Sequence, residues 1–159
     1  MPINSPRPLL RPVLDEKDRR ILVSLRKDSK ATTKAISEET GIPRTTVHDR
    51  ITKLETRGIV RKYTVLPDYT KLGEDSTAFV FVSYDPRSGV RQQDVAEALS
   101  TMDGVYEVHM ISGDWDIIAK VRGPSVEQIG ALVIDKVRAM GGVGKTVTSN
   151  VLRTVKDEV

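Results

Sequence analysis

Gly41 and Ile42 separate two stretches of helical sequence, and this short interval restricts the fold more than any other feature of the chain. The stretch before it opens with threonines that suit an N-cap and stops at Gly41. The stretch after it begins at Pro43, which the first turn of a helix tolerates, and stops at Gly58. Two helices joined by a tight glycine turn are typical of a helix-turn-helix.

A further helix precedes this pair. Asp15 is its N-cap candidate, with acidic residues in the first turn and basic residues in the last, as the helix dipole favours. Ile21, Leu22 and Leu25 form its apolar stripe. We therefore expect a helix-turn-helix DNA-binding domain over residues 14–60.

The third helix has two distinct faces. Val47, Ile51 and Leu54 follow i, i+4 and i+7 spacing and are expected to pack inward. A recognition helix presents its other face to base edges and lets basic side chains reach the phosphates. The candidate DNA-binding residues are therefore Thr45, Thr46, His48, Asp49 and Thr52 toward the bases, and Arg44, Lys53 and Arg57 toward the phosphates.

Asp49 has two readings, because a carboxylate repels phosphate. It could accept a hydrogen bond from a cytosine amino group. It could instead only restrain Arg50 or Lys53. The sequence leaves both open.

Charge is distributed unevenly along the chain. Up to Leu72 there are 16 Lys/Arg and 9 Asp/Glu, a net +7, and from Gly73 onward 9 and 13, a net −4, which together give the overall +3. This asymmetry indicates a polyanionic partner for the first part alone. Residues 1–13 contain four prolines, which predicts a flexible arm. Its Arg7 and Arg11 could follow DNA, or the arm could be a terminus without a role.

The second half has a different pattern. Residues 61–75 are expected to form a β-ribbon linker, either a wing or a dimer-forming strand. Over residues 76–159 we expect, in order, a strand at 76–85, a helix, strands beginning at 105 and 115, a helix at 125–140 and a strand at 145–155. The order β-α-β-β-α-β predicts a ferredoxin-like domain, so the whole chain is α+β.

The first of these strands is apolar on both faces. Phe79 and Phe81 point to one side, and Ala78, Val80 and Val82 to the other. Two helices cover only one face of such a sheet, so we expect a second subunit to cover the other face and the chain to form a homodimer.

Several functional classes are excluded or disfavoured. The chain has no cysteine and only two histidines, so disulfides and thiolate metal sites are excluded and no metal or cofactor is expected. No apolar run approaches the length of a membrane span, which predicts a cytoplasmic protein without a membrane partner. No catalytic constellation is visible, so we expect no enzymatic activity.

The segment AMGGVGKT, residues 139–146, resembles the end of a phosphate-binding loop. Such a loop follows a strand and opens a helix, with a glycine at its first position. Here the first position is Ala139, and the predicted order is a helix followed by a strand. We therefore expect a glycine-rich helix exit and no nucleotide binding.

Two carboxylates, Asp114 and Asp116, flank Trp115 in the turn SGDWD. Paired carboxylates could serve acid–base chemistry. No nucleophile or histidine is grouped with them, and glycine and aspartate are also common in ordinary turns.

The chain resembles the Lrp/AsnC, or feast/famine, family of prokaryotic transcription regulators. The resemblance rests on LDEKDRRIL, on GIPRTTVHDRITKLETRGIVRKYTVL and on HMISGDWDIIAKV, which holds a Gly-Asp-aromatic-Asp turn typical of that family. It implies sheet-paired dimers, often assembled into tetramers or octamers, and a small amino-acid effector bound near that turn. The implied effector-binding residues are Ser112, Gly113, Asp114, Trp115, Asp116, Thr146, Thr148 and Ser149.

The leading hypothesis is thus a sequence-specific regulator that binds double-stranded DNA and responds to an amino acid. One alternative is an architectural DNA-binding protein without a specific effector. Another is an enzyme or enzyme-regulatory subunit built on the ferredoxin-like half alone.

Overall fold

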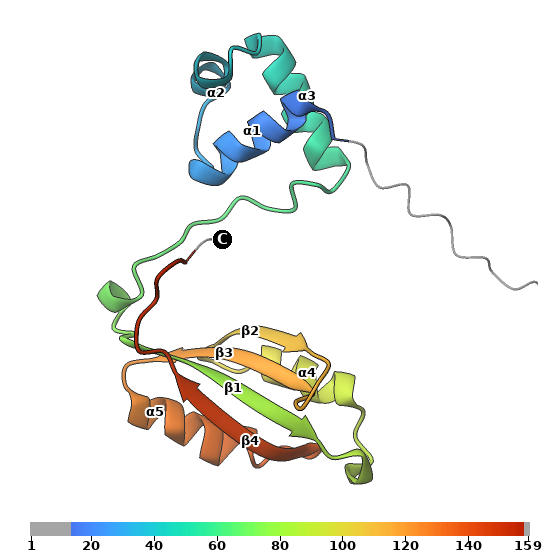
Figure 1. Ribbon diagram of the computed structural model, residues 1–159, viewed down its shortest axis with the longest axis vertical. Helices are drawn as coiled ribbons and strands as arrows, with labels where there is room; N and C mark the ends of the chain where they lie inside the picture. The colour runs from blue at the N-terminus through green and yellow to red at the C-terminus, as the bar shows by residue number, and fades with distance from the viewer. Residues whose placement is uncertain (1–13, 158–159) are drawn as a thin grey trace, which may run out of the picture. The chain divides into compact units, whose positions relative to one another are not determined.

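The structure, a computed structural model, describes residues 14–157 (Figure 1). The chain divides between Leu66 and Pro67 into two compact units, here called the N-terminal and C-terminal units. The arm predicted over residues 1–13 lies outside the described residues.

The N-terminal unit contains three helices, α1 (Glu16–Lys27), α2 (Thr33–Thr40) and α3 (Arg44–Thr56). The expected cap of α1 is confirmed, since the Asp15 carboxylate accepts from the Asp18 N–H at 2.9 Å and the Asp18 carboxylate accepts from the Asp15 N–H at 3.2 Å. Of the two threonine candidates, Thr32 caps α2. Gly41 ends α2 with a φ of 67°, a left-handed conformation that glycine adopts without strain.

The turn of the helix-turn-helix is part of the core. Ile42 lies between α2 and α3 and is 3% exposed, so the turn is held by an apolar side chain as well as by its glycine. The other buried apolar residues of this unit are Ile21, Leu25, Ile36, Val47 and Leu54. Ile51 packs against this cluster from its edge, so the inward stripe predicted for α3 is confirmed.

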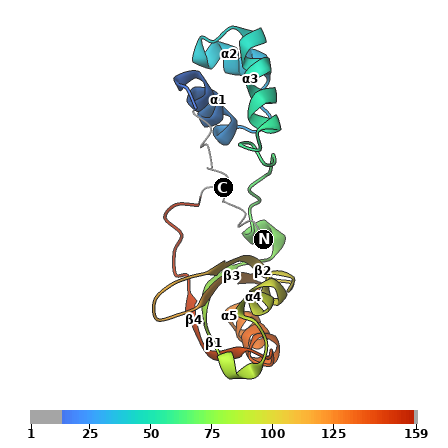
Figure 2. The same cartoon turned by 90° about the vertical axis from the view of Figure 1, so that its right-hand side faces the viewer.

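The C-terminal unit is a four-stranded antiparallel sheet with helices on one side (Figure 2). Its strands are β1 (Ser76–Tyr84), β2 (Val105–Met110), β3 (Ile117–Gly123) and β4 (Val143–Asn150), in the order β2-β3-β1-β4. The helices are α4 (Gln92–Ser100) and α5 (Val126–Ala131), the latter continued by a π-helical turn at Leu132–Val137. The expected ferredoxin-like arrangement is confirmed.

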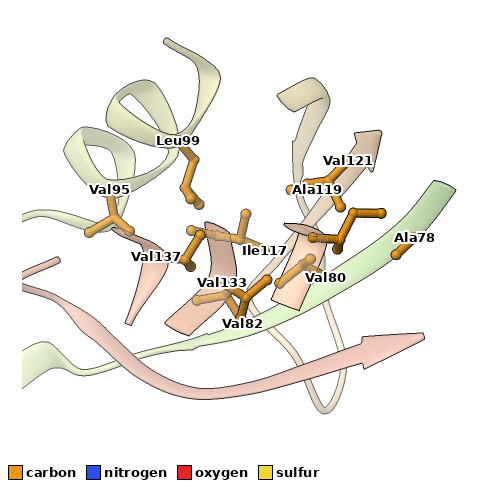
Figure 3. Close-up of a cluster of buried hydrophobic side chains, with 11 residues drawn as sticks. Ala78, Val80, Val82, Val95, Leu99, Ile117, Ala119, Val121, Val133 and Val137 are labelled. Atoms are coloured by element: carbon orange, nitrogen blue, oxygen red, sulfur yellow. The ribbon is translucent and has the colours of Figure 1, made fainter. Parts of the chain in front are cut away.

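The core lies between the sheet and these helices (Figure 3). Alternate residues of β1, including Val80 and Val82, are at most 1% exposed and point to the helices, since side chains along a strand alternate between faces. Val95 and Leu99 meet them from α4. Each fully buried side chain of this size stabilises the fold by about 1.5–3 kcal/mol.

Two predicted element ends differ from the structure. The last strand, expected at 145–155, begins at Val143 and ends at Asn150, because its partner β1 begins at Ser76 and the register pairs Ala78 with Asn150. The last helix, expected at 125–140, changes to a π-helical turn at Leu132. A strand or helix end set by a distant partner is not visible in local spacing.

The β-ribbon predicted over 61–75 does not form within the described chain. Residues 61–69 are extended but pair with no strand of this chain, and a 3-10 turn follows at Thr70–Leu72. A ribbon requires a neighbouring strand to accept its backbone hydrogen bonds. Pro67 also removes one donor from this segment.

Candidate DNA and effector sites

The outer face of α3 is exposed over most of its predicted DNA-binding residues. Seven of the eight candidates are exposed, and Thr46 is half-buried: Arg44, Thr45, His48, Asp49, Thr52, Lys53 and Arg57 form the exposed set. The helix begins after Pro43 without a side-chain cap, which leaves the first N–H groups of α3 accessible to an anion.

Arg50 holds α3 to α1 from behind this face. One guanidinium nitrogen lies 2.7 Å and 2.6 Å from the two carboxylate oxygens of Asp15 and 2.7 Å from Asp18 Oδ1. The Asp18 N–H and the Arg50 guanidinium lower the pKa of Asp15. The capping box that starts α1 therefore also positions the recognition helix, a role that sequence reasoning missed because Arg50 is 35 residues from Asp15.

The Arg50 contacts bear on the reading of Asp49. Asp49 Oδ1 lies 3.5 Å from His48 Nδ1, on the exposed side of the helix. Arg50 is already bound by Asp15 and Asp18. The suggestion that Asp49 restrains Arg50 is therefore wrong, and Asp49 instead neighbours another candidate DNA contact.

Other polar groups of α3 are bound within the unit. Arg44 Nε donates to Thr33 Oγ1 at the start of α2, at 3.2 Å. The Thr52 hydroxyl donates to the His48 carbonyl at 3.1 Å, so its oxygen remains available only as an acceptor. Arg44 is thus oriented by its neighbour helix, which suits a phosphate contact made by both helices together.

The glycine-rich segment 139–146 serves packing. It follows the π-helical turn and leads into β4, the reverse of a phosphate-binding loop. Gly142 has a φ of 88°, and a Cβ at this position would lie 2.6 Å from Val95 Cγ2. A Cβ on Gly144 would lie 2.9 Å from Ser83 Oγ. The glycines therefore allow this turn to pack closely against α4 and β1.

The turn between β2 and β3 is fixed to β1 by Asp116. Its N–H donates to the Val82 carbonyl at 3.1 Å, and its carboxylate accepts from the Tyr84 N–H at 2.8 Å. The Ile111 N–H donates to the Asp116 carbonyl at 2.9 Å. The Asp116 carboxylate therefore satisfies a backbone donor where the pairing of β1 with β4 shifts register.

Asp114 differs from Asp116 in its surroundings. It is exposed, and within residues 14–157 it makes no hydrogen bond or ion pair. Ser112 and Gly113 beside it are exposed too. Of the two carboxylates in the turn, Asp114 is the one available to a ligand cation.

Trp115 brings a residue of the glycine-rich segment to the turn. Its ring centroid lies 6.0 Å from that of Phe81, and Lys145 Nζ lies 5.7 Å from the Trp115 centroid. Sequence reasoning used Lys145 only as part of the near-miss nucleotide motif. The structure places its ammonium group at the predicted effector site.

The three predicted hydroxyl contacts of β4 do not share one face. Thr146 pairs with Val82 and is 9% exposed, and its hydroxyl accepts from Arg138 Nε at 2.8 Å. Thr148, opposite Val80, lies on the same side. Ser149 pairs with Phe79 and therefore lies on the other side of the sheet.

That other side, here called the open face, carries an apolar patch of Phe79, Phe81, Ile118 and Val147. Val147 is 38% exposed, and the other three are half-buried in the single chain. Both helices lie on the opposite side (Figure 2). Within the described residues there is no cluster of three metal-ligating side chains, and no helix there is long and apolar enough to span a membrane.

Comparisons with known proteins agree with this two-part layout. A family model described as winged helix-turn-helix DNA-binding matches residues 14–61, and one described as Lrp/AsnC ligand binding domain matches residues 77–159. An uncharacterised HTH-type transcriptional regulator of Pyrococcus horikoshii is 47% identical over 92% of this chain and 98% of its own length.

Solved structures show the same fold. A transcriptional regulator from Neisseria meningitidis, solved as a complex with L-methionine, is 24% identical with a TM-score of 0.85 over 92% of this chain and 94% of that one. A feast or famine regulatory protein from M. tuberculosis, also complexed with L-methionine, is 25% identical with a TM-score of 0.82 over 91% and 96%. With its helix-turn-helix, its ferredoxin-like unit and these relatives, the chain belongs to the Lrp/AsnC family of transcriptional regulators.

Proposed function

We propose that this regulator binds double-stranded DNA sequence-specifically through the outer face of α3, and that a small amino acid bound at the turn 112–116 changes its activity or assembly. The observation that carries the proposal is the separation of roles in the structure. Arg50, Val47 and Leu54 hold α3 from behind, while its outer face stays exposed. The turn holds a free carboxylate, Asp114, beside an aromatic ring.

The charge of each group suggests its DNA contact. Arg44, Lys53 and Arg57 are suited to phosphates, which supply affinity without sequence information. Thr45, Thr46, His48, Asp49 and Thr52 are suited to base edges.

The effector part of the proposal rests on charge complementarity. An amino acid carries an ammonium group, which Asp114 can bind, and a carboxylate, which the N–H groups of Ser112 and Gly113 can bind. The Trp115 ring offers an apolar surface for a side chain. The M. tuberculosis relative was solved with L-methionine, which makes this amino acid the first probe for this chain.

Homodimerisation is proposed from two features. The open face exposes aromatic and aliphatic side chains, of which Phe79 and Phe81 are the largest. The unpaired segment 61–69 has free backbone donors and acceptors, as a dimer-forming strand would. Assembly of dimers into tetramers or octamers would follow the family pattern.

The DNA part is tested by the salt dependence of binding. Lys53→Ala and Arg57→Ala should each weaken binding to all duplexes and reduce the slope of log K against log salt by about one. Lys136→Ala removes the same charge from an exposed position of the C-terminal unit and should leave the slope unchanged. Unchanged slopes in both α3 variants would show that this helix does not contact the phosphates.

The effector part is tested by thermal unfolding with each of the twenty amino acids, L-methionine first. A ligand at 100 times its Kd stabilises the native state by about 2.7 kcal/mol, which a melting curve resolves. If the chain is instead an architectural protein without an effector, no amino acid will raise the melting temperature.

A further inference from the structure

Arg122 lies at the centre of a cluster of aromatic and charged side chains in the C-terminal unit. Its guanidinium carbon is 3.8 Å from the centroid of the Tyr69 ring and 5.7 Å from that of Tyr106. The two rings meet edge to face with centroids 5.2 Å apart. The Arg122 side chain is only 11% exposed, so its charge is largely removed from water and depends on these partners.

Arg122 joins segments from both ends of this unit. Tyr69 belongs to the linker that precedes β1, and Arg122 Nη1 donates to Thr77 Oγ1 at the start of β1, at 3.1 Å. Arg122 Nη2 lies 3.4 Å from Asp157, in the segment that follows β4, and Lys120 Nζ lies 3.8 Å from the same carboxylate. Figure 1 shows the linker and the C-terminal segment leaving the same end of the sheet.

The linker is also fixed on the Tyr106 side. The Tyr106 hydroxyl donates to the carboxylate of Glu74 at 2.7 Å and 2.5 Å. Glu74 in turn donates its N–H to the Tyr69 carbonyl at 2.9 Å. Residues 69–74 are therefore folded as a small turn whose two ends both contact the aromatic pair.

We propose that Arg122 is a shared anchor that holds the linker residues 67–74 and the C-terminal residues 151–157 to the sheet, and so limits the length of free chain between the two units. Removal of the guanidinium releases both segments at once. Removal of Tyr69 or of the Asp157 charge releases only the segment that carries it. The proposal does not depend on the effector or on its identity.

The length of free chain follows from where each end of the linker is held. Toward the N-terminal unit, the Tyr63 hydroxyl donates to Glu55 at 2.7 Å and the Ser29 hydroxyl donates to the Thr64 carbonyl at 3.2 Å. With Tyr69 anchored, about four residues separate the two attachments and reach at most ~14 Å. With the anchor released, about eleven residues extend to β1 and reach at most ~37 Å.

Spin-label distance measurements on the full chain test this anchor directly, since the natural sequence has no cysteine. Leu72 and Val155 are exposed positions on the two held segments, and Ile134 is an exposed reference on the π-helical turn. The pairs Leu72→Cys with Ile134→Cys, and Val155→Cys with Ile134→Cys, report on the linker and the C-terminal segment. Dilution with unlabelled chain removes distances between subunits.

Each pair should give one narrow distance in the otherwise natural sequence. Arg122→Gln should broaden both distributions, by about 11 Å for a label some four residues from the sheet. Tyr69→Leu should broaden only the linker distance, and Asp157→Asn only the C-terminal one. Arg138→Gln removes an arginine–hydroxyl bond elsewhere in this unit and should change neither.

The outcome separates the possible results. Narrow distributions in a folded Arg122→Gln variant, or broadening of one segment alone, would overturn the shared anchor. If Arg122→Gln does not fold, the other two variants decide. Separate release of the two segments then supports the anchor, and two unchanged distances refute it.

Discussion

Alanine substitutions at Asp114 and Asp116 should have opposite consequences, although the two residues flank the same tryptophan. Asp116→Ala removes the acceptor of the Tyr84 N–H, which lies 2.8 Å away in a partly buried position. Asp114→Ala removes an exposed carboxylate that has no partner within the described chain. The first change should lower stability, and the second should lower effector affinity.

The magnitudes follow from these contacts. A hydrogen bond to a charged group contributes about 1.5–3 kcal/mol, and an unsatisfied donor costs about 1–3 kcal/mol. Asp116→Ala should therefore lower the free energy of unfolding by about 1.5–3 kcal/mol, whereas an exposed substitution such as Asp114→Ala should stay within about 0.5 kcal/mol. With a urea m-value of about 2 kcal/mol/M, the midpoint of Asp116→Ala should fall by about 1 M. Asp114→Ala should weaken amino-acid binding about ten- to a hundred-fold or more.

Urea unfolding at fixed chain concentration measures the first quantity, and Trp115 emission during titration with L-methionine, or with the amino acid found in the thermal screen, measures the second. Asp116→Asn keeps a carbonyl acceptor for Tyr84 and serves as the matched control, with stability close to that of the natural sequence. The reasoning is refuted if Asp114→Ala leaves ligand binding unchanged, or if Asp116→Asn weakens ligand binding as strongly as Asp114→Asn.

Three further predictions concern other parts of the chain. Gly142→Ala should lower stability by about 2–5 kcal/mol in thermal or urea unfolding, because a left-handed backbone and a close Val95 contact both oppose a Cβ; Gly130→Ala, with open space around it, is the control, and an equal loss there would contradict the packing argument. The lowered pKa of Asp15 means that its stabilisation is fully present above about pH 4 and is lost as pH falls through the lower folded-state value; helical circular dichroism should show an acid-induced loss that Asp15→Asn abolishes, and an identical acid transition in this variant would contradict the assignment. ATP and GTP should not bind, and Lys145→Ala should change only the emission of Trp115; saturable nucleotide binding lost in this variant would contradict the helix-to-strand reading.

Local signals in the sequence were sufficient for most of the fold. The caps at Asp15 and Gly41, and the stripe of Val47 and Leu54, depend on residues within a few positions of one another. The same holds for the alternation in β1. These features decide element type, and element order then decides the topology.

Features that depend on distant partners were not predictable. The two aspartates of SGDWD look alike in sequence, but Asp116 is distinguished by Tyr84, which is 32 residues away. The end of β4 is set by the start of β1, and Lys145 reaches Trp115 only because the sheet brings their strands close together. Local spacing carries no information about such contacts.

The way α3 is attached also bears on how this chain could diversify. The contacts that hold the helix are made by Val47, Arg50 and Leu54 on its inner side. Substitutions at exposed positions such as Thr45 and His48 therefore cost little stability, within about 0.5 kcal/mol each. Duplicated copies of the gene could acquire new operator preferences there while the scaffold stays constant, and the same positions are the natural choice for redirecting the protein to a chosen promoter.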